Sequence, residues 1–299
     1  MNTFITNPFS KSFVRSVVLG LMLTAATSTC ADIETTSEEF TIDRPHGKLT
    51  VAMQTAAGKP LADDPLVLLN FTADRKSSMV DGKYGSIVRP FLEQGHRVVS
   101  FDLPAHGDRI DELGSGIAGM AASVVAGQKP FEAFVEDGKA VIDSLIKRGL
   151  AKSGRIVVCG VSRAGYCALR LAAADDRIAA TSALSPVTDW AVLKEFTQSQ
   201  NLPEVKALAL TNFAEKLAGK RFYVAIGNAD SRVGTDACTQ FILSVNDAEK
   251  ARSLKTSSVR YLMVDDSVDH SLNTRWRQEG IQFLLKPPVA AAVQQDLPK

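Results

Sequence analysis

The chain has 299 residues, of which 45% are hydrophobic and 22% charged, an ordinary composition for a globular protein. Its formal net charge of +1 argues against the strongly basic surface of a nucleic-acid-binding protein, so we expect no nucleic-acid partner. Folds of the α/β class with this length often form a single domain.

The first residues have the pattern of an export signal. Two basic residues, Lys11 and Arg15, precede an apolar run over residues 17–26, and small residues then offer a cleavage site. The apolar run is too short for a permanent membrane-spanning helix, so no stable membrane insertion is expected. We predict a signal peptide over residues 1–31 and a secreted or periplasmic protein, with lipid attachment at Cys30 as the less favoured alternative.

Three cysteines follow the predicted signal peptide: Cys159, Cys167 and Cys238. Their odd number and the lack of a Cys-x-x-Cys spacing argue against a disulfide framework or a zinc site. We expect buried free thiols. No metal and no cofactor are predicted.

Strands and helices alternate along most of the chain. Residues 39–43 and 49–54 alternate between apolar and polar and predict an antiparallel hairpin. Further strands are expected at residues 66–71, 97–103, 178–184, 221–227 and 259–264. Helical periodicity predicts helices at residues 84–95, 131–150, 235–253 and 273–285.

This alternation predicts a doubly wound, mostly parallel eight-stranded sheet with an antiparallel N-terminal hairpin and helices on both faces. Residues 110–128, rich in Gly, Ala and Ser, are expected to form a long connection. Residues 187–219 are predicted to be a small helical lid inserted in a domain of residues 32–286. Residues 287–299 are predicted to be a flexible tail.

Residues 155–174 combine a strand, a tight turn and a helix around Ser162. Gly160 and Ala164, two positions before and after the serine, allow the strand and the helix to pass closely. The usual pattern is Gly-x-Ser-x-Gly, and here Ala occupies its last position. The alternative for so short a motif is a Gly-Ser turn in an ordinary βα unit.

A serine nucleophile needs a base and a carboxylate that orients the base. Of four histidines, His270 follows the last predicted strand, where α/β proteins place their chemistry, and His106 follows an earlier strand. Asp230 follows the strand before His270 and is the favoured acid. Asp189 and Asp236 are rival acids. Ser162, Asp230 and His270 therefore occur in the order Ser, Asp, His, each beyond a different strand.

The sequence resembles the α/β-hydrolase family, in particular its prolyl-oligopeptidase-like and dienelactone-hydrolase-like members. The resemblance covers most of residues 65–285 and rests on three segments, residues 160–166, 227–233 and 269–271. It implies that Ser162 is the nucleophile, His270 the general base and Asp230 the residue that orients the base.

The resemblance also implies an oxyanion hole made of backbone N–H groups. One donor would be Arg163, directly after the nucleophile. The second would come from the loop after the third strand, where we select Phe71 or Thr72. This loop lacks the His-Gly pair that is common in the family.

Three side chains are candidates for the substrate pocket: Arg75, His106 and Trp190. For His106 a structural role in its own loop is favoured, and Trp190 has simple lid packing as its alternative. The Arg163 side chain offers two interpretations, binding of an anionic substrate or, as the favoured one, an ion pair with a local acid such as Asp189.

These observations lead to a secreted serine hydrolase that cleaves an ester, or an amide, through an acyl-enzyme. Its expected partner is a small-molecule ester or a short peptide.

A long propeller domain before residue 65 is missing, which favours an esterase over a prolyl-oligopeptidase-like peptidase. A catalytically silent scaffold that acts as a binding protein is the alternative from another class. A metal-dependent hydrolase is less favoured because no cluster has ligand spacing. The sequence leaves the oligomeric state and the physiological substrate undetermined.

Overall fold

The computed structural model describes residues 33–82, 84–255, 257, 259–265, 269–270 and 274–286. The predicted signal peptide and the predicted tail lie outside these residues. Within the described ranges, no helix is both long and apolar enough to cross a bilayer.

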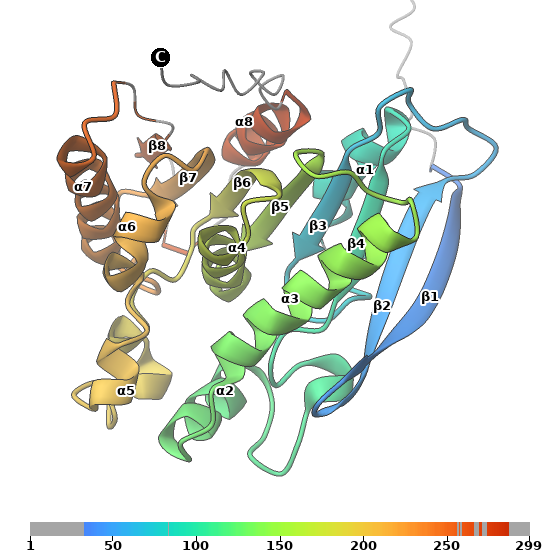
Figure 1. The fold of residues 1–299 in the computed structure, drawn as a ribbon. Coiled ribbons are helices and arrows are strands. Elements are labelled where there is room, and N and C mark those ends of the chain that lie inside the picture. Colours follow the sequence, from blue (N-terminus) through green and yellow to red (C-terminus); the bar gives the residue numbers. More distant parts are fainter. Residues whose placement is uncertain are drawn as a thin grey trace, which may run out of the picture. The chain divides into compact units, whose positions relative to one another are not determined.

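A single eight-stranded sheet organises these residues, with the strand order β1-β2-β4-β3-β5-β6-β7-β8 (Figure 1). The strands are β1 (Thr35–Arg44), β2 (Gly47–Ala56), β3 (Val67–Phe71), β4 (Arg97–Phe101), β5 (Ile156–Val161), β6 (Ile178–Leu184), β7 (Phe222–Gly227) and β8 (Val259–Val264). β2 pairs antiparallel with both β1 and β4, and every other neighbouring pair is parallel. The predicted mostly parallel sheet with an antiparallel N-terminal hairpin is confirmed.

Helices cover both faces of the sheet because side chains alternate along its central strands. In β3, Val67 and Leu69 belong to one apolar cluster, and Leu68 belongs to the other. The first cluster includes residues of α3 (Pro130–Lys147), α4 (Arg163–Ala174) and α7 (Thr235–Ala251), and the second includes residues of α1 (Gly85–Glu93) and α8 (Thr274–Leu285).

One helix was not predicted. Residues 110–128 were expected as a connection, but they contain the α-helix α2 (Gly116–Val125). The short 3-10 helix η1 (Gly107–Arg109) directly precedes this range. α2 buries Met120 and Val124. Its remaining residues are mostly small, so the periodic apolar signal that marks longer helices is weak in this stretch.

Residues 187–219, the predicted helical lid, contain short helices of three or four residues each. The 3-10 helices are η2 (Trp190–Val192), η3 (Lys194–Phe196) and η4 (Leu210–Phe213), and the α-helices are α5 (Pro203–Lys206) and α6 (Ala214–Leu217). The segment packs on α2, α4 and α7. Trp190 anchors it, with its ring 4.5 Å from that of Phe131 and 5.1 Å from that of Tyr166.

The three cysteines of the described chain, Cys159, Cys167 and Cys238, are buried and free, as predicted. Burial raises the pKa of each thiol to about 12. These side chains therefore pack as small apolar groups rather than as reactive thiolates.

Candidate active site

The turn at Ser162 joins β5 to α4. Ser162 has φ 57° and ψ −121°, a backbone conformation that non-glycine residues rarely adopt. Its N–H donates to the Leu184 carbonyl at 2.9 Å, and its carbonyl accepts the N–H of Gly165 at 2.9 Å. These bonds hold the serine at the carboxyl edge of the sheet despite the strain.

Small residues around Ser162 are required by close packing. A Cβ on Gly160 would lie 2.1 Å from the Ala164 carbonyl oxygen, and one on Gly165 would lie 2.9 Å from Cβ of Pro186. Ala164 is itself fully buried, so its methyl group fills space that glycine would leave empty. The alanine in the last position of the motif is therefore compatible with the turn.

Ser162, His270 and Asp230 form a continuous chain of hydrogen bonds. His270 Nε2 lies 2.9 Å from Ser162 Oγ, and His270 Nδ1 lies 2.9 Å from Asp230 Oδ2. A carboxylate only accepts, so Nδ1 carries the proton and Nε2 is left to accept from the serine hydroxyl. Such an imidazole can remove the hydroxyl proton, and the carboxylate can stabilise the resulting imidazolium.

The Asp230 carboxylate is fixed by its own loop. Its Oδ1 accepts the N–H groups of Arg232 and Val233, each at 3.1 Å, and its side chain is 0% exposed. The two rival acids lie elsewhere. Asp189 accepts the N–H of Ala191 at 2.9 Å, and Asp236 is exposed in the first turn of α7.

A second contact joins the loops that carry Asp230 and His270. Asp269 Oδ1 accepts the Ser231 hydroxyl at 2.8 Å and the Ser231 N–H at 3.3 Å. The hydrogen bond from the Ser231 hydroxyl is the main cause that lowers the pKa of Asp269. Sequence reasoning missed this pair, and its only signal is that each residue directly adjoins a candidate catalytic residue.

The loop after β3 is braced by its own side chains. The Thr72 N–H donates to Ser78 Oγ at 3.1 Å, and Asn70 Nδ2 donates to the Ser78 carbonyl at 2.6 Å. Phe71 is fully buried as the last residue of β3. Ala73, which sequence reasoning missed, is partly exposed, and among the described residues its N–H has no acceptor.

Arg75 is used in structural ion pairs. Its Nη1 lies 2.7 Å from Asp102 Oδ2 and 2.9 Å from Asp108 Oδ2, and its Nε lies 2.8 Å from Glu39 Oε1. The Arg75 side chain is 9% exposed. Trp190 is fully buried. The structure therefore does not bring these two pocket candidates to an accessible surface.

His106 lies against the side chain of Arg163. Its Nδ1 donates to the Pro104 carbonyl at 2.8 Å, and its Nε2 accepts from Arg163 Nε at 3.0 Å. Burial is the main cause that lowers the pKa of His106, and the Arg163 charge lowers it further. The predicted ion pair of Arg163 with Asp189 is therefore not formed, and the neutral His106 imidazole takes its place as the partner of the guanidinium.

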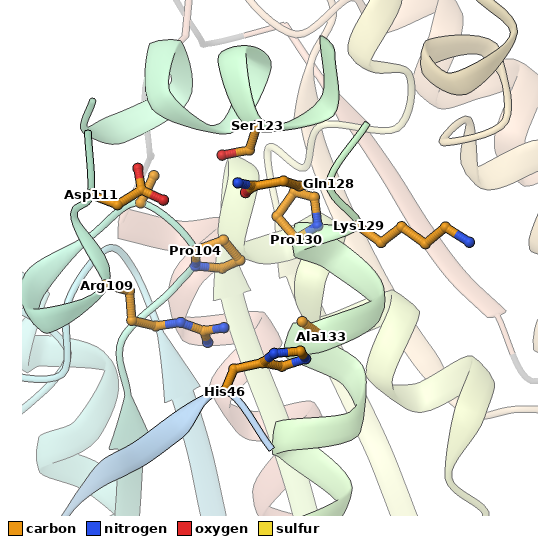
Figure 2. Close-up of a pocket in the computed structure, with 10 residues that line it drawn as sticks. His46, Pro104, Arg109, Asp111, Ser123, Gln128, Lys129, Pro130 and Ala133 are labelled. Carbon is orange, nitrogen blue, oxygen red and sulfur yellow. The ribbon is translucent and has the colours of Figure 1, made fainter. Parts of the chain in front are cut away.

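A pocket of about 610 Å³ lies beside the loop that carries His106. Figure 2 shows Arg109 and His46 on one side of it, Ser123 and Gln128 on the other, and Pro104 between them. None of the three hydrogen-bonded residues Ser162, Asp230 and His270 lines it. This hollow is therefore separate from the serine.

Comparison with known proteins identifies a matching family and structures with a similar fold. The model described as the alpha/beta hydrolase family matches residues 77–289. No curated protein matches the chain by sequence. The acetyl xylan esterase from Paenibacillus sp. R4 is similar with a TM-score of 0.64 and 15% identity, over 85% of this chain and 84% of that one. A cold-adapted esterase from an Arctic intertidal metagenomic library has a TM-score of 0.61 and 15% identity, over 85% of this chain and 94% of that one. A putative dipeptidyl aminopeptidase IV from Bacteroides ovatus has a TM-score of 0.63 and 16% identity, over 85% of this chain but 36% of that one.

Proposed function

Because the chain belongs to the alpha/beta hydrolase family, we propose that it is a serine hydrolase that cleaves esters through an acyl-enzyme. The observation that carries the proposal is the unbroken hydrogen-bonded chain from Ser162 through His270 to Asp230, with 2.9 Å at each step. The strained serine at the strand–helix turn supports the same role, since strain of this kind gathers at reactive residues.

In this mechanism Ser162 Oγ attacks the ester carbonyl while His270 Nε2 takes the hydroxyl proton. The carbonyl oxygen becomes an oxyanion, and we assign its donors to the N–H groups of Arg163 and Ala73. Arg163 is the first residue of α4, so its N–H has no acceptor within the helix, and the positive end of the helix favours the oxyanion. We choose Ala73 over Thr72 because the Thr72 N–H is already bonded to Ser78.

The tetrahedral intermediate then collapses. The bond to the leaving oxygen breaks, His270 gives its proton to the departing alcohol, and the acyl group stays on Ser162 as an ester. A water molecule repeats the sequence: His270 takes its proton, the water oxygen bonds to the acyl carbon, and Ser162 recovers its hydroxyl proton as the carboxylic acid leaves.

Esters are favoured over peptides by two neighbours. The structures that this chain matches over most of both lengths are named as esterases, whereas the dipeptidyl aminopeptidase is matched over 36% of its length. A peptidase of the same mechanism is the second candidate, and peptide substrates in the same assay distinguish it.

The test is Ser162→Ala with 4-nitrophenyl acetate as the substrate. Loss of the nucleophile is expected to lower kcat by about three to six orders of magnitude. Ser185→Ala is the matched control, because Ser185 directly follows β6 and its buried hydroxyl has no hydrogen-bond partner among the described residues. A fluorophosphonate probe should label the wild type and Ser185→Ala but not Ser162→Ala. Full activity in Ser162→Ala would contradict the assignment, and a folded wild type that stays unlabelled would favour a silent scaffold.

We also propose export of the protein, on the basic–apolar–small pattern of residues 1–31. Fractionation of expressing cells should recover a shortened chain outside the cytoplasm. A full-length chain that stays in the cytoplasm would contradict export.

A further inference from the structure

A positive charge lies beside the candidate nucleophile without a carboxylate partner. Among the described residues, the Arg163 side chain donates its hydrogen bond to His106 Nε2, and no carboxylate lies within ion-pair distance of it. Arg232 is a useful contrast, because its guanidinium binds both carboxylate oxygens of Glu195, at 2.7 and 2.8 Å. Arg163 therefore differs from Arg232 in having no carboxylate of the described chain at ion-pair distance.

A partly buried guanidinium without a carboxylate at ion-pair distance is costly, because it has lost much of its water. Burial is the main cause that lowers the pKa of Arg163. The Arg232 charge lowers it further, whereas Tyr84 and the charge of Glu195, which lies beyond ion-pair distance, raise it. His106 supplies no negative charge to offset this cost. Its Nδ1 proton is donated to the Pro104 carbonyl, and its ring is neutral because Nε2 accepts from Arg163. It does fix the orientation of the guanidinium through Nε. The two Nη groups form a planar edge that fits a carboxylate, and among the described residues no acceptor occupies that edge.

The strand order sets the side of Ser162 on which this edge lies. Arg163 follows β5 and His106 follows β4, and β3 lies between these two strands in the sheet. The Arg163 side chain therefore crosses the carboxyl end of β3. His270 follows β8, which lies on the other side of β5. The Arg163–His106 contact thus lies on the β4 side of β5, and the strand that leads to His270 lies on the other side.

This placement separates the two parts of an ester. The leaving alcohol must depart on the side of His270, which protonates it. The acyl substituent is left for the opposite side, where the guanidinium lies. We propose that Arg163 binds an anionic group on the acyl part of the substrate, so that the preferred substrates are esters whose acyl chain carries a carboxylate, such as half-esters of dicarboxylic acids.

This inference rests on the proposed serine hydrolase and narrows its substrate class. The first experiment compares two matched pairs of phenyl esters on the wild-type protein. In one pair the acyl chain ends in a carboxylate or in the neutral amide, as in monophenyl adipate and phenyl 5-carbamoylpentanoate. In the other pair the charge is on the leaving group, as in 4-acetoxybenzoate and 4-acetoxybenzamide.

A hydrogen-bonded ion pair predicts about 10- to 100-fold higher kcat/KM for the acyl carboxylate than for its amide. No comparable preference is expected in the leaving-group pair. Equal rates within the acyl pair overturn the inference, and so does a preference confined to the leaving-group pair. Either result leaves the proposed function standing, because that function is tested separately by the loss of activity in Ser162→Ala.

Variants of Arg163 then assign the preference to its side chain. The measured quantity is the ratio of kcat/KM for the acyl carboxylate to that for its amide. Arg163→Gln should bring this ratio close to one, and Arg163→Lys should give an intermediate ratio, because it keeps the charge without the planar edge. Arg260→Gln removes an equal charge from the amino end of β8 and should leave both the ratio and the activity unchanged.

A wild-type ratio in Arg163→Gln overturns the inference. Where that variant is too unstable to assay, Arg163→Lys decides, and a ratio equal to that of the wild type has the same consequence. A loss of the ratio in Arg260→Gln also overturns it, because the preference would then follow net charge rather than Arg163.

Discussion

At Ser162 the backbone passes from strand to helix with φ 57°, and three neighbouring positions make this turn possible. Gly160 has no room for a side chain, Gly165 packs against Pro186, and Ala164 fills a closed space. The chemistry at this position therefore depends on side-chain volume at its neighbours as much as on the serine itself. The departure from the usual motif falls at the position where a methyl group fits.

Exchanging the small residues should have unequal effects. Gly160→Ala forces a Cβ against the Ala164 carbonyl, which no rotamer change can relieve, and should cost about 2–3 kcal/mol of unfolding free energy together with esterase activity. Ala164→Gly restores the usual motif and should cost about 1–2 kcal/mol, through helix propensity and one lost methyl group. Urea unfolding followed by circular dichroism measures both. Equal stability of Gly160→Ala and the wild type would show that the turn can open.

Among the elements, the loops at the carboxyl ends of the strands differ in how they are held. The loop after β3 is braced by Thr72, Ser78 and Asn70, whereas the loops after β7 and β8 are tied to each other by Ser231 and Asp269. Asp269 adjoins His270 and has φ 58°. We therefore expect the Ser231–Asp269 contact to position the imidazole of His270.

Ser231→Ala should lower kcat about 3- to 10-fold with little change in KM, since a hydrogen bond to a charged group orients the base. Ser231→Thr keeps the hydroxyl and should recover most of the rate. Ser244→Ala, which removes an exposed hydroxyl from α7, is the control and should leave kcat unchanged. Initial rates over a range of substrate concentrations separate the two parameters. An unchanged kcat in Ser231→Ala would remove the positioning role.

Across the whole molecule, two buried histidines couple folding to pH. Burial is the main cause that lowers the pKa of both His96 and His106 below the usual value. The His96 ring accepts the Leu66 N–H at 3.4 Å through Nδ1, which requires that nitrogen to be unprotonated. We therefore expect these two histidines to bind fewer protons in the folded protein than in the unfolded chain in mild acid.

The free energy of unfolding should consequently fall between about pH 7 and pH 5. The contribution of a neutral histidine is complete above its unfolded pKa of about 6.5 and is lost progressively as the pH falls below that value. His96→Gln should flatten this dependence, because its side chain does not titrate. His46→Gln alters an exposed turn residue and is the control. A slope as steep in His96→Gln as in the wild type would contradict this account.

Local pattern was sufficient for much of this protein. Runs of apolar residues marked the strands, alternation marked the N-terminal hairpin, and the order Ser162, Asp230, His270 placed three residues beyond three strands whose carboxyl ends share an edge. These features depend on residues close in sequence and on the general geometry of parallel sheets. The same reasoning missed α2, whose small side chains leave little periodic signal.

Only the tertiary structure decided which partners the side chains take. Arg75 was a pocket candidate but binds Asp102, Trp190 was a candidate but is fully buried, and Arg163 was expected near an acid but meets His106. A charged or aromatic residue can satisfy itself with any of several groups far away in sequence, and the choice depends on which strands lie side by side. The strand order β4-β3-β5 brings Arg163 to His106, and no pattern within either loop contains that information.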